Sequence, residues 1–212
     1  MDSQLKAQID ALLGAGAKQS HTSSATIPVG ISNRHVHLSQ ADVETLFGTG
    51  YRLTELKALR QPGQFAAEEC VTVVGPKGSL TRVRVLGPVR TRTQLEISRA
   101  DAYALGISAP LRESGDLAGA GDALLIGPKG HVALSGQVIC AWRHIHLSPT
   151  EAAQLGLNHG QRVQVVSTGE RALTFDQVVV RVHPDFSLEF HIDTEEANAA
   201  GLRNGDRVAV AG

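Results

Sequence analysis

The sequence is poor in the features that would assign it to a specialised class of protein. Its 212 residues include only two cysteines, which is too few for a disulfide scaffold and favours a reducing interior. No segment approaches the roughly 18 consecutive apolar residues that cross a bilayer, and the N-terminus lacks the pattern of a secretory signal. Lys plus Arg (20) nearly balance Asp plus Glu (21), so no net field attracts nucleic acid or an anionic membrane. We therefore expect a soluble intracellular protein that binds neither nucleic acid nor membrane.

Short motifs of the common nucleotide and acyl-transfer enzymes are also missing. The chain has no Walker loop, no Gly-x-Gly-x-x-Gly and no Gly-x-Ser-x-Gly elbow. The glycine-rich stretch 114–121 lacks the order of a phosphate cradle and is typical of a linker. Cys70 precedes a strand pattern and Cys140 lies in the apolar run 138–142, with no companion residues for either. We interpret both cysteines as buried, inert thiols.

An internal repeat is the main organising feature of the chain. The hexapeptide Arg34–Ser39 returns as Arg143–Ser148 with five of six positions identical, and residues 95–107 align with residues 190–202. The repeat predicts two related halves, 27–120 and 121–212, with a boundary near residues 112–126. An exchange of strands between the halves would make this boundary approximate.

The pattern after residue 26 predicts short strands with few helices. The predicted strands are 71–74, 81–85, 163–166, 178–182 and 207–210. Gly-Pro-Lys-Gly follows such a run at 75–78 and again at 127–130, as a tight turn would. Ser39 and Ser148 are predicted to cap helices that begin at residues 40 and 149. We therefore predict a mainly β fold, with two related β-barrel domains from an internal duplication, capped by short α-helices.

Residues 1–20 predict an N-terminal amphipathic helix, followed by a small, polar linker over residues 21–26. The apolar side chains that share one helical face are Leu5, Ile9, Leu12 and Leu13. A helix this short is marginal in water and needs a partner surface. Two interpretations remain open from the pattern alone: the helix packs on its own domain, or it docks into a groove of another protein.

The repeated His-x-His motif predicts metal binding. Residues two apart in a strand point to the same face, so the two imidazoles of each motif can converge on one ion. Because the repeat aligns Glu96 with His191, it nominates these two residues as the third ligands. The predicted ligand sets are His35, His37 and Glu96 in one half, and His144, His146 and His191 in the other. Both sets suit two Zn²⁺ ions, although histidines that cap helix starts at a packing corner are the structural alternative.

One arginine near these motifs occurs in a single half. Arg90 lies just before Glu96, and the equivalent segment 184–187 has no arginine. An arginine that serves only one half is not required by the shared fold, so we predict that Arg90 holds phosphate through its guanidinium fork, with a solvated surface charge as the structural alternative. Arg34 and Arg143 adjoin the predicted ligands, and for them a structural ion pair and a substrate contact remain equally open.

These motifs resemble those of the PduL-type phosphate propanoyltransferases of bacterial microcompartments, over essentially all of residues 27–212. The resemblance rests on Asn33–Ser39, Gly87–Arg90, Arg143–Pro149 and Glu189–Asp193. It implies two β-barrel domains with two zinc ions between them, held by the six predicted ligands, and a phosphate site at Arg90. It also implies exchange of coenzyme A for phosphate on a short acyl group, propanoyl or acetyl.

The resemblance further implies that residues 1–20 are an encapsulation peptide that binds microcompartment shell proteins. The protein would then lie in the microcompartment lumen within the cytoplasm, and we expect it to form a homo-oligomer. Other divalent ions can replace zinc with these ligand types. Two rival functions stay open at this point: a dinuclear zinc hydrolase, and a non-catalytic structural module of the microcompartment that holds structural zinc.

Overall fold

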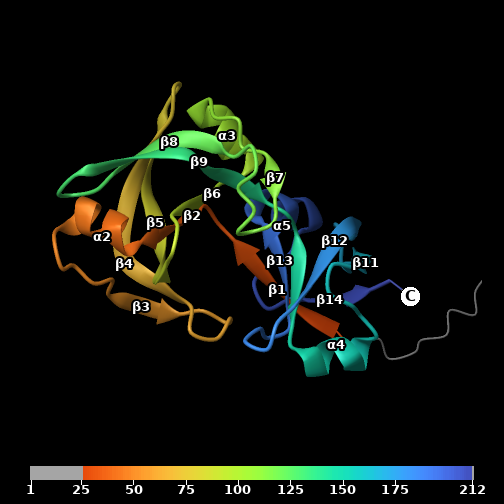
Figure 1. The fold of residues 1–212 in the computed structure, drawn as a ribbon. Coiled ribbons are helices and arrows are strands. Elements are labelled where there is room, and N and C mark those ends of the chain that lie inside the picture. The colour runs from red at the N-terminus through yellow and green to blue at the C-terminus, as the bar shows by residue number, and fades with distance from the viewer. Residues whose placement is uncertain (1–25, 212) are drawn as a thin grey trace, which may run out of the picture.

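The computed structural model describes residues 26–211, which form a mainly β fold (Figure 1). The predicted N-terminal helix at 1–20 lies outside the described residues, as does the predicted linker up to residue 25. The helices in the described part of the chain are α2 (Gln40–Phe47), α3 (Arg99–Leu105), α4 (Pro149–Leu155) and α5 (Thr194–Ala200). Each has seven or eight residues, so the strands carry the architecture.

The first barrel closes through six strands in the order β4-β5-β2-β6-β9-β8. These strands are β2 (His35–Ser39), β4 (Phe65–Val74), β5 (Ser79–Arg90), β6 (Gln94–Glu96), β8 (Gly121–Ile126) and β9 (His131–Ala141). Two further strands extend the sheet, β3 (Glu55–Ala58) beside β4 and β7 (Leu111–Arg112) beside β9.

The second barrel closes in the order β1-β13-β10-β12-β11-β14. Its strands are β1 (Thr26–Ser32), β10 (His144–Leu147), β11 (Arg162–Val166), β12 (Thr174–Val182), β13 (Glu189–Asp193) and β14 (Arg207–Val210). Parallel and antiparallel pairs occur in both barrels. The predicted fold class, two β-barrels with short helices, is therefore confirmed.

The two barrels exchange strands. β1, the first described strand, pairs in parallel with β13 and antiparallel with β14, so it completes the second barrel. In Figure 1 this red strand lies among the blue strands of the C-terminal barrel. Conversely, β8 and β9 close the first barrel. The chain therefore crosses between barrels twice, at residues 33–34 and at residues 142–143, and each crossing leads directly into a His-x-His strand.

Helix starts and turns follow the local sequence signals. Ser39 and Ser148 accept hydrogen bonds from backbone N–H groups of α2 and α4, as predicted. The predicted Gly-Pro-Lys-Gly turns join β4 to β5 and β8 to β9. A Cβ on Gly75 would overlap the carbonyl oxygen of Leu105 at the end of α3, and one on Gly127 would overlap that of Leu46 at the end of α2. Glycine is required at both turns because they pack directly against helix ends.

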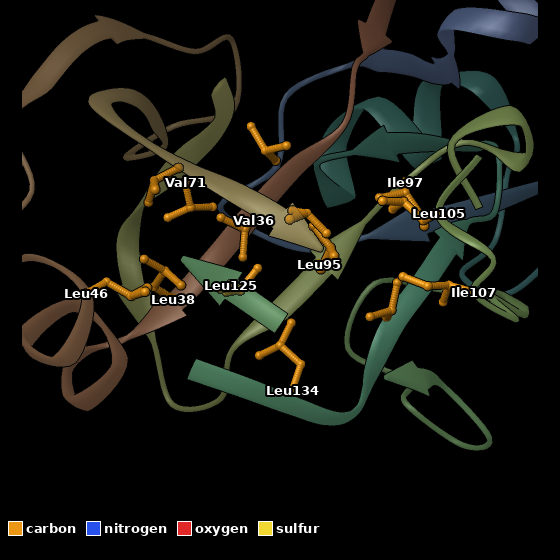
Figure 2. Close-up of a cluster of buried hydrophobic side chains, with 14 of the residues drawn as sticks. Val36, Leu38, Leu46, Val71, Leu95, Ile97, Leu105, Ile107, Leu125 and Leu134 are labelled. Atoms are coloured by element: carbon orange, nitrogen blue, oxygen red, sulfur yellow. The ribbon is translucent and has the colours of Figure 1, made fainter. Parts of the chain in front are cut away.

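Strand alternation sorts the side chains of β2 and β10 between the core and the space outside each barrel. Val36 and Leu38 are fully buried in the core of the first barrel, where Figure 2 shows them with Leu95 and Leu125. The histidines that alternate with them, His35 and His37, point to the opposite face. The apolar residues of each strand therefore anchor the barrel and hold the histidines of that strand in place.

Candidate metal site between the barrels

Strand pairing assembles the six predicted ligands into two groups of three. In the antiparallel ladder of β2 and β6, His35 lies opposite Glu96. In that of β10 and β13, His144 lies opposite His191. The groups are His35, His37 and Glu96, and His144, His146 and His191, and in each group the ligand atoms lie within 4.8 Å of one another. These two triads could each hold a metal ion.

Backbone carbonyls orient the first histidine of each triad. His35 Nδ1 is 2.8 Å from the carbonyl oxygen of Asn33, and His144 Nδ1 is 2.7 Å from that of Trp142. A hydrogen bond from Nδ1–H to a carbonyl leaves the lone pair on Nε2, the usual arrangement in a metal-bound histidine. The carbonyl belongs in both cases to the crossing segment just before the strand, so the repeat preserves this support as well as the ligands.

Several buried nitrogen atoms of the triads have no hydrogen-bond partner in the described residues. They are Nδ1 of His37 and both ring nitrogens of His146. His37 is only 3% exposed and His146 only 6%. A buried polar atom without a partner costs roughly 1–3 kcal/mol, and coordination of an ion would satisfy one nitrogen of each ring. The donor set therefore fits a divalent metal ion.

The electrostatics keep the histidines in the form that binds metal. Burial, followed by the proximity of His191, lowers the pKa of His144 to about 3. Burial likewise lowers the pKa values of His37 and His146. Burial alone would raise the pKa of Glu96, but the neighbouring histidines, His35 foremost, lower it to about 2. At neutral pH, His37, His144 and His146 are thus neutral imidazoles and Glu96 is an ionised carboxylate.

Arg90 lies at the end of β5, beside the first triad. Its Nη1 donates to Ser114 Oγ at 3.2 Å. Burial lowers the pKa of the Arg90 guanidinium, while the charge of Glu96 raises it, and Arg90 keeps its charge at neutral pH. The side chain is half-buried and lines the same cavity as the triads. This position is compatible with the predicted contact to an anion.

Sequence reasoning missed a second arginine at the site. Arg181 on β12 lies in register beside His146, lines the same cavity, and places Nη2 3.4 Å from the carbonyl oxygen of Ser114. The parallel ladders place Arg181 beside the second histidine in one barrel and Leu86 beside it in the other. Arg181 is therefore also present in only one half, and the argument that selected Arg90 would have found it.

The cavity between the barrels has a volume of about 820 Å³ and is lined by both triads, Arg90 and Arg181. Because the residues of both triads line this cavity, the two triads face the same space. In the described part of the chain, no helix is long and apolar enough to cross a membrane. The cavity is large enough for an extended ligand with both polar and apolar parts.

Arg34 and Arg143 also line the cavity, whereas Cys70 and Cys140 do not. Arg34 forms an ion pair with Asp101 at 3.0 Å, and Arg143 forms one with Glu196 at 3.3 Å, which ties each crossing segment to the start of a helix. Cys140 is buried, and burial raises its pKa to about 11. The expectation of burial is wrong for Cys70, which is half-buried on β4.

The fold and the site together define a class: a two-barrel protein in which two triads that could hold metal ions line one cavity together with several arginines, Arg90 and Arg181 among them. The sequence model of the family described as phosphate propanoyltransferase matches residues 28–203. This chain is 57% identical over 185 residues to the phosphate propanoyltransferase of Thermotoga maritima, covering 87% of this chain and 88% of that protein. It is 55% identical over 179 residues to that of Salmonella typhimurium, with coverage of 84% and 85%.

A third relative, the phosphate propanoyltransferase of Rhodobacter capsulatus, is 49% identical over 199 residues and covers 94% of this chain and 93% of its own length. The chain therefore belongs to the phosphate propanoyltransferase family, a family of acyltransferase enzymes. This confirms the resemblance that the motifs indicated.

Proposed function

We propose that this chain is a metal-dependent phosphate propanoyltransferase, which interconverts propanoyl-CoA plus phosphate and propanoyl phosphate plus CoA. One observation carries the proposal: two buried triads with unpaired imidazole nitrogens open onto the same cavity as Arg90 and Arg181. The names of the relatives support the reaction. Acetyl-CoA is a shorter donor of the same chemistry, and we infer that it competes for the same site.

Two divalent ions, which we propose to be zinc, would occupy the triads. Imidazole and carboxylate donors suit zinc, and three protein ligands leave one coordination position for a substrate. Cobalt or another divalent ion can substitute with these donors. When bound, the ion supplies a Lewis acid that polarises the thioester carbonyl.

The two arginines are proposed to bind and orient phosphate. Both approach Ser114, Arg90 at its hydroxyl and Arg181 at its carbonyl, so two cations border the same part of the cavity. A guanidinium fork binds two phosphate oxygens and directs a third toward the carbonyl carbon. The new C–O bond forms as the C–S bond breaks, and the CoA sulfur takes up the proton that phosphate loses. Cys140 is protonated at neutral pH and is not available as a nucleophile.

Metal analysis combined with a phosphate-dependent CoA-release assay tests this function. We expect about two divalent ions per chain, and CoA release from propanoyl-CoA that requires phosphate and stops after chelation. Donors of two, three, four and six acyl carbons give the chain-length preference. Equal CoA release without phosphate would instead show a hydrolase. If the protein holds its metal ions but releases no CoA under any condition, the result would favour a non-catalytic structural module.

We further propose that residues 1–20 form a docking helix for microcompartment shell proteins, which places the enzyme in the microcompartment lumen. The family model begins its match at residue 28, so the predicted helix precedes the segment that the model covers. Deletion of residues 1–20 is expected to preserve CoA release and abolish co-assembly with shell protein. Leu12→Asp, which interrupts the apolar face without shortening the chain, is a second variant that is expected to have the same effect. Light scattering of the full-length chain gives its mass in solution and tests the proposed homo-oligomer. The same measurement on the deletion variant tests whether the helix contributes to it.

A further inference from the structure

The third member of each triad is hydrogen-bonded to the residue two positions before it in the same strand. On β6, Gln94 Nε2 donates to Glu96 Oε1 at 2.6 Å. On β13, His191 Nε2 lies 2.6 Å from Glu189 Oε2 and donates its proton to that carboxylate. Residues two apart share one face of a strand, so both contacts lie on the face that carries the triad.

Gln94 and Glu189 occupy equivalent places in the two barrels. Gln94 lies in register opposite His37, and Glu189 lies in register opposite His146. Each therefore adjoins the second histidine of its triad as well as the third member. Both are buried, at 2% and 7% exposure. Neither was selected from the sequence, although Glu189 lies in the motif that carried the family resemblance.

The hydrogen bonds at the two places have opposite polarity. Where the triad ends in the carboxylate of Glu96, the supporting side chain is an amide, which can donate to it. Where it ends in the imidazole of His191, the supporting side chain is a carboxylate, which can accept from it. Each triad together with its supporting residue therefore contains one carboxylate. Two carboxylates at the first place would repel each other, and the duplicated halves avoid that pair.

The surroundings of Gln94 fix the orientation of its amide. Its Oε1 accepts from the backbone N–H of Gly115 at 2.8 Å, so the NH₂ group must lie on the side of Glu96. The same NH₂ group donates to Ser114 Oγ at 2.8 Å. Because the N–H of Gly115 can only donate and the Glu96 carboxylate can only accept, the amide cannot rotate by 180° without losing these two bonds.

The first barrel holds Glu189 in place, although Glu189 belongs to the second barrel. Gln61, in the loop between β3 and β4, donates from Nε2 to Glu189 Oε2 at 2.9 Å and to the carbonyl oxygen of Ser187 at 3.0 Å. Its Oε1 accepts from the backbone N–H of Ser187 at 3.2 Å. Gln61 is 3% exposed, so these bonds are shielded from water.

We propose that Gln94 and Glu189 are matched positioning residues, which orient the third ligand of each triad by hydrogen bonds of opposite polarity. The inference rests on the proposed function, in which both triads hold divalent ions. A histidine that donates Nε2–H to Glu189 keeps its lone pair on Nδ1, and the bond increases the basicity of the ring. Partners of this kind typically contribute 10–100-fold to metal affinity.

Chelator competition on the full-length protein, loaded with Zn²⁺ or Co²⁺, tests the inference. Glu189→Gln removes the acceptor charge, and we expect one of the two ions to bind about 10–100-fold more weakly while the other keeps its affinity. Gln94→Glu is expected to weaken the other ion, because it places a second carboxylate against Glu96. Glu189→Asp keeps the charge and is expected to lose less affinity than Glu189→Gln.

Glu69→Gln is the matched control. Glu69 is also a buried carboxylate, at 7% exposure, but it bonds to Tyr51 Oη and to the backbone N–H of Thr54, and it does not line the cavity. The same chemical change there is expected to alter the free energy of unfolding and leave both metal affinities unchanged. Equal weakening in this control would reduce the effect of Glu189→Gln to general destabilisation and overturn the inference.

Three further outcomes separate the inference from the function on which it rests. Unchanged affinities in Glu189→Gln would overturn the positioning role and leave the proposed function intact. If Glu189→Gln lost one ion completely and its visible Co²⁺ spectrum changed in the same way as that of His191→Ala, Glu189 would be a metal ligand. This result would also overturn the positioning role. Unaltered protein that binds no divalent ion would overturn the metal-dependent function itself.

Discussion

Glu96 on β6 lies in register opposite His35 on β2, with Oε2 3.5 Å from Nε2. Directly opposed residues in an antiparallel ladder have Cβ atoms about 5 Å apart, so the strand pairing itself brings the two side chains together. His191 and His144 have the same relationship in the second barrel. The triads are thus built on paired strands whose opposite faces are packed in a core, which favours a preformed site.

Glu96→Gln is expected to remove one divalent ion per chain and to lower phosphate-dependent CoA release on the order of 100-fold. The amide keeps the shape of the side chain but loses the charge that the ion requires. Inductively coupled plasma mass spectrometry and the CoA-release assay measure the two effects. Glu55→Gln, an exposed change on β3, serves as the control. Retention of both ions in Glu96→Gln would contradict the ligand assignment.

Arg90→Lys keeps a positive charge but removes the planar fork that binds two phosphate oxygens. We expect kcat/KM for phosphate to fall about 100-fold, while the KM for propanoyl-CoA and the metal content stay unchanged. Steady-state kinetics at varied phosphate concentration measure this. Arg92→Lys is the matched control, because Arg92 is exposed and donates a hydrogen bond to the carbonyl oxygen of Gly136, away from the cavity lining. Loss of metal in Arg90→Lys would show that Arg90 supports the triad instead.

The raised pKa of Cys140 predicts that the protein loses stability at alkaline pH. Burial, and then the charge of Asp193, raises the pKa of Cys140 from 9.0 to about 11. Because the folded pKa is the higher one, the unfolded chain releases this proton first, and its contribution to stability is lost as pH rises from 9 to 11. We expect the free energy of unfolding to fall by about 1.4 kcal/mol between pH 8 and pH 10 from this group.

Urea unfolding of the unaltered protein and of Cys140→Val, each at pH 8 and pH 10, isolates that contribution. Valine at position 140 cannot ionise. The free energy of unfolding of this variant is therefore expected to fall by about 1.4 kcal/mol less than that of the unaltered protein between pH 8 and pH 10. Identical pH dependence in the two proteins would show that the thiol keeps an ordinary pKa in the folded state.

Gly30→Ala is expected to disturb the second triad from outside it. A Cβ at position 30 on β1 would lie 2.6 Å from Glu189 Oε1 and 2.9 Å from His191 Cδ2. Overpacking of this kind typically costs about 1–3 kcal/mol, and here it also displaces the bond between Glu189 and His191. Urea unfolding and metal analysis are expected to show lower stability and a weakened second ion. Thr26→Val, exposed on the same strand, should change neither.

Much of this architecture could be predicted because its signals are local or repeated. The His-x-His interpretation requires a strand in which His35 and His37 share a face, and β2 is such a strand, with Val36 and Leu38 of its other face buried in the barrel core. Ser39 and Ser148 cap their helices because their hydroxyls can reach the free N–H groups of the first turn. The alignment of Glu96 with His191 predicts their equivalent places opposite a histidine.

The strand pattern, the duplication and the six side chains that converge in two triads could be predicted before any fold was known, because each depends on residues close in the chain or on the repeat. Only the tertiary structure decided which barrel each strand joins, and therefore which side chains meet across the cavity. Arg181 reaches the region of Ser114, and Gln61 reaches Glu189, through contacts between residues more than 60 positions apart. Such contacts cannot be predicted from sequence periodicity, because they arise from strand exchange that packs one barrel against the other.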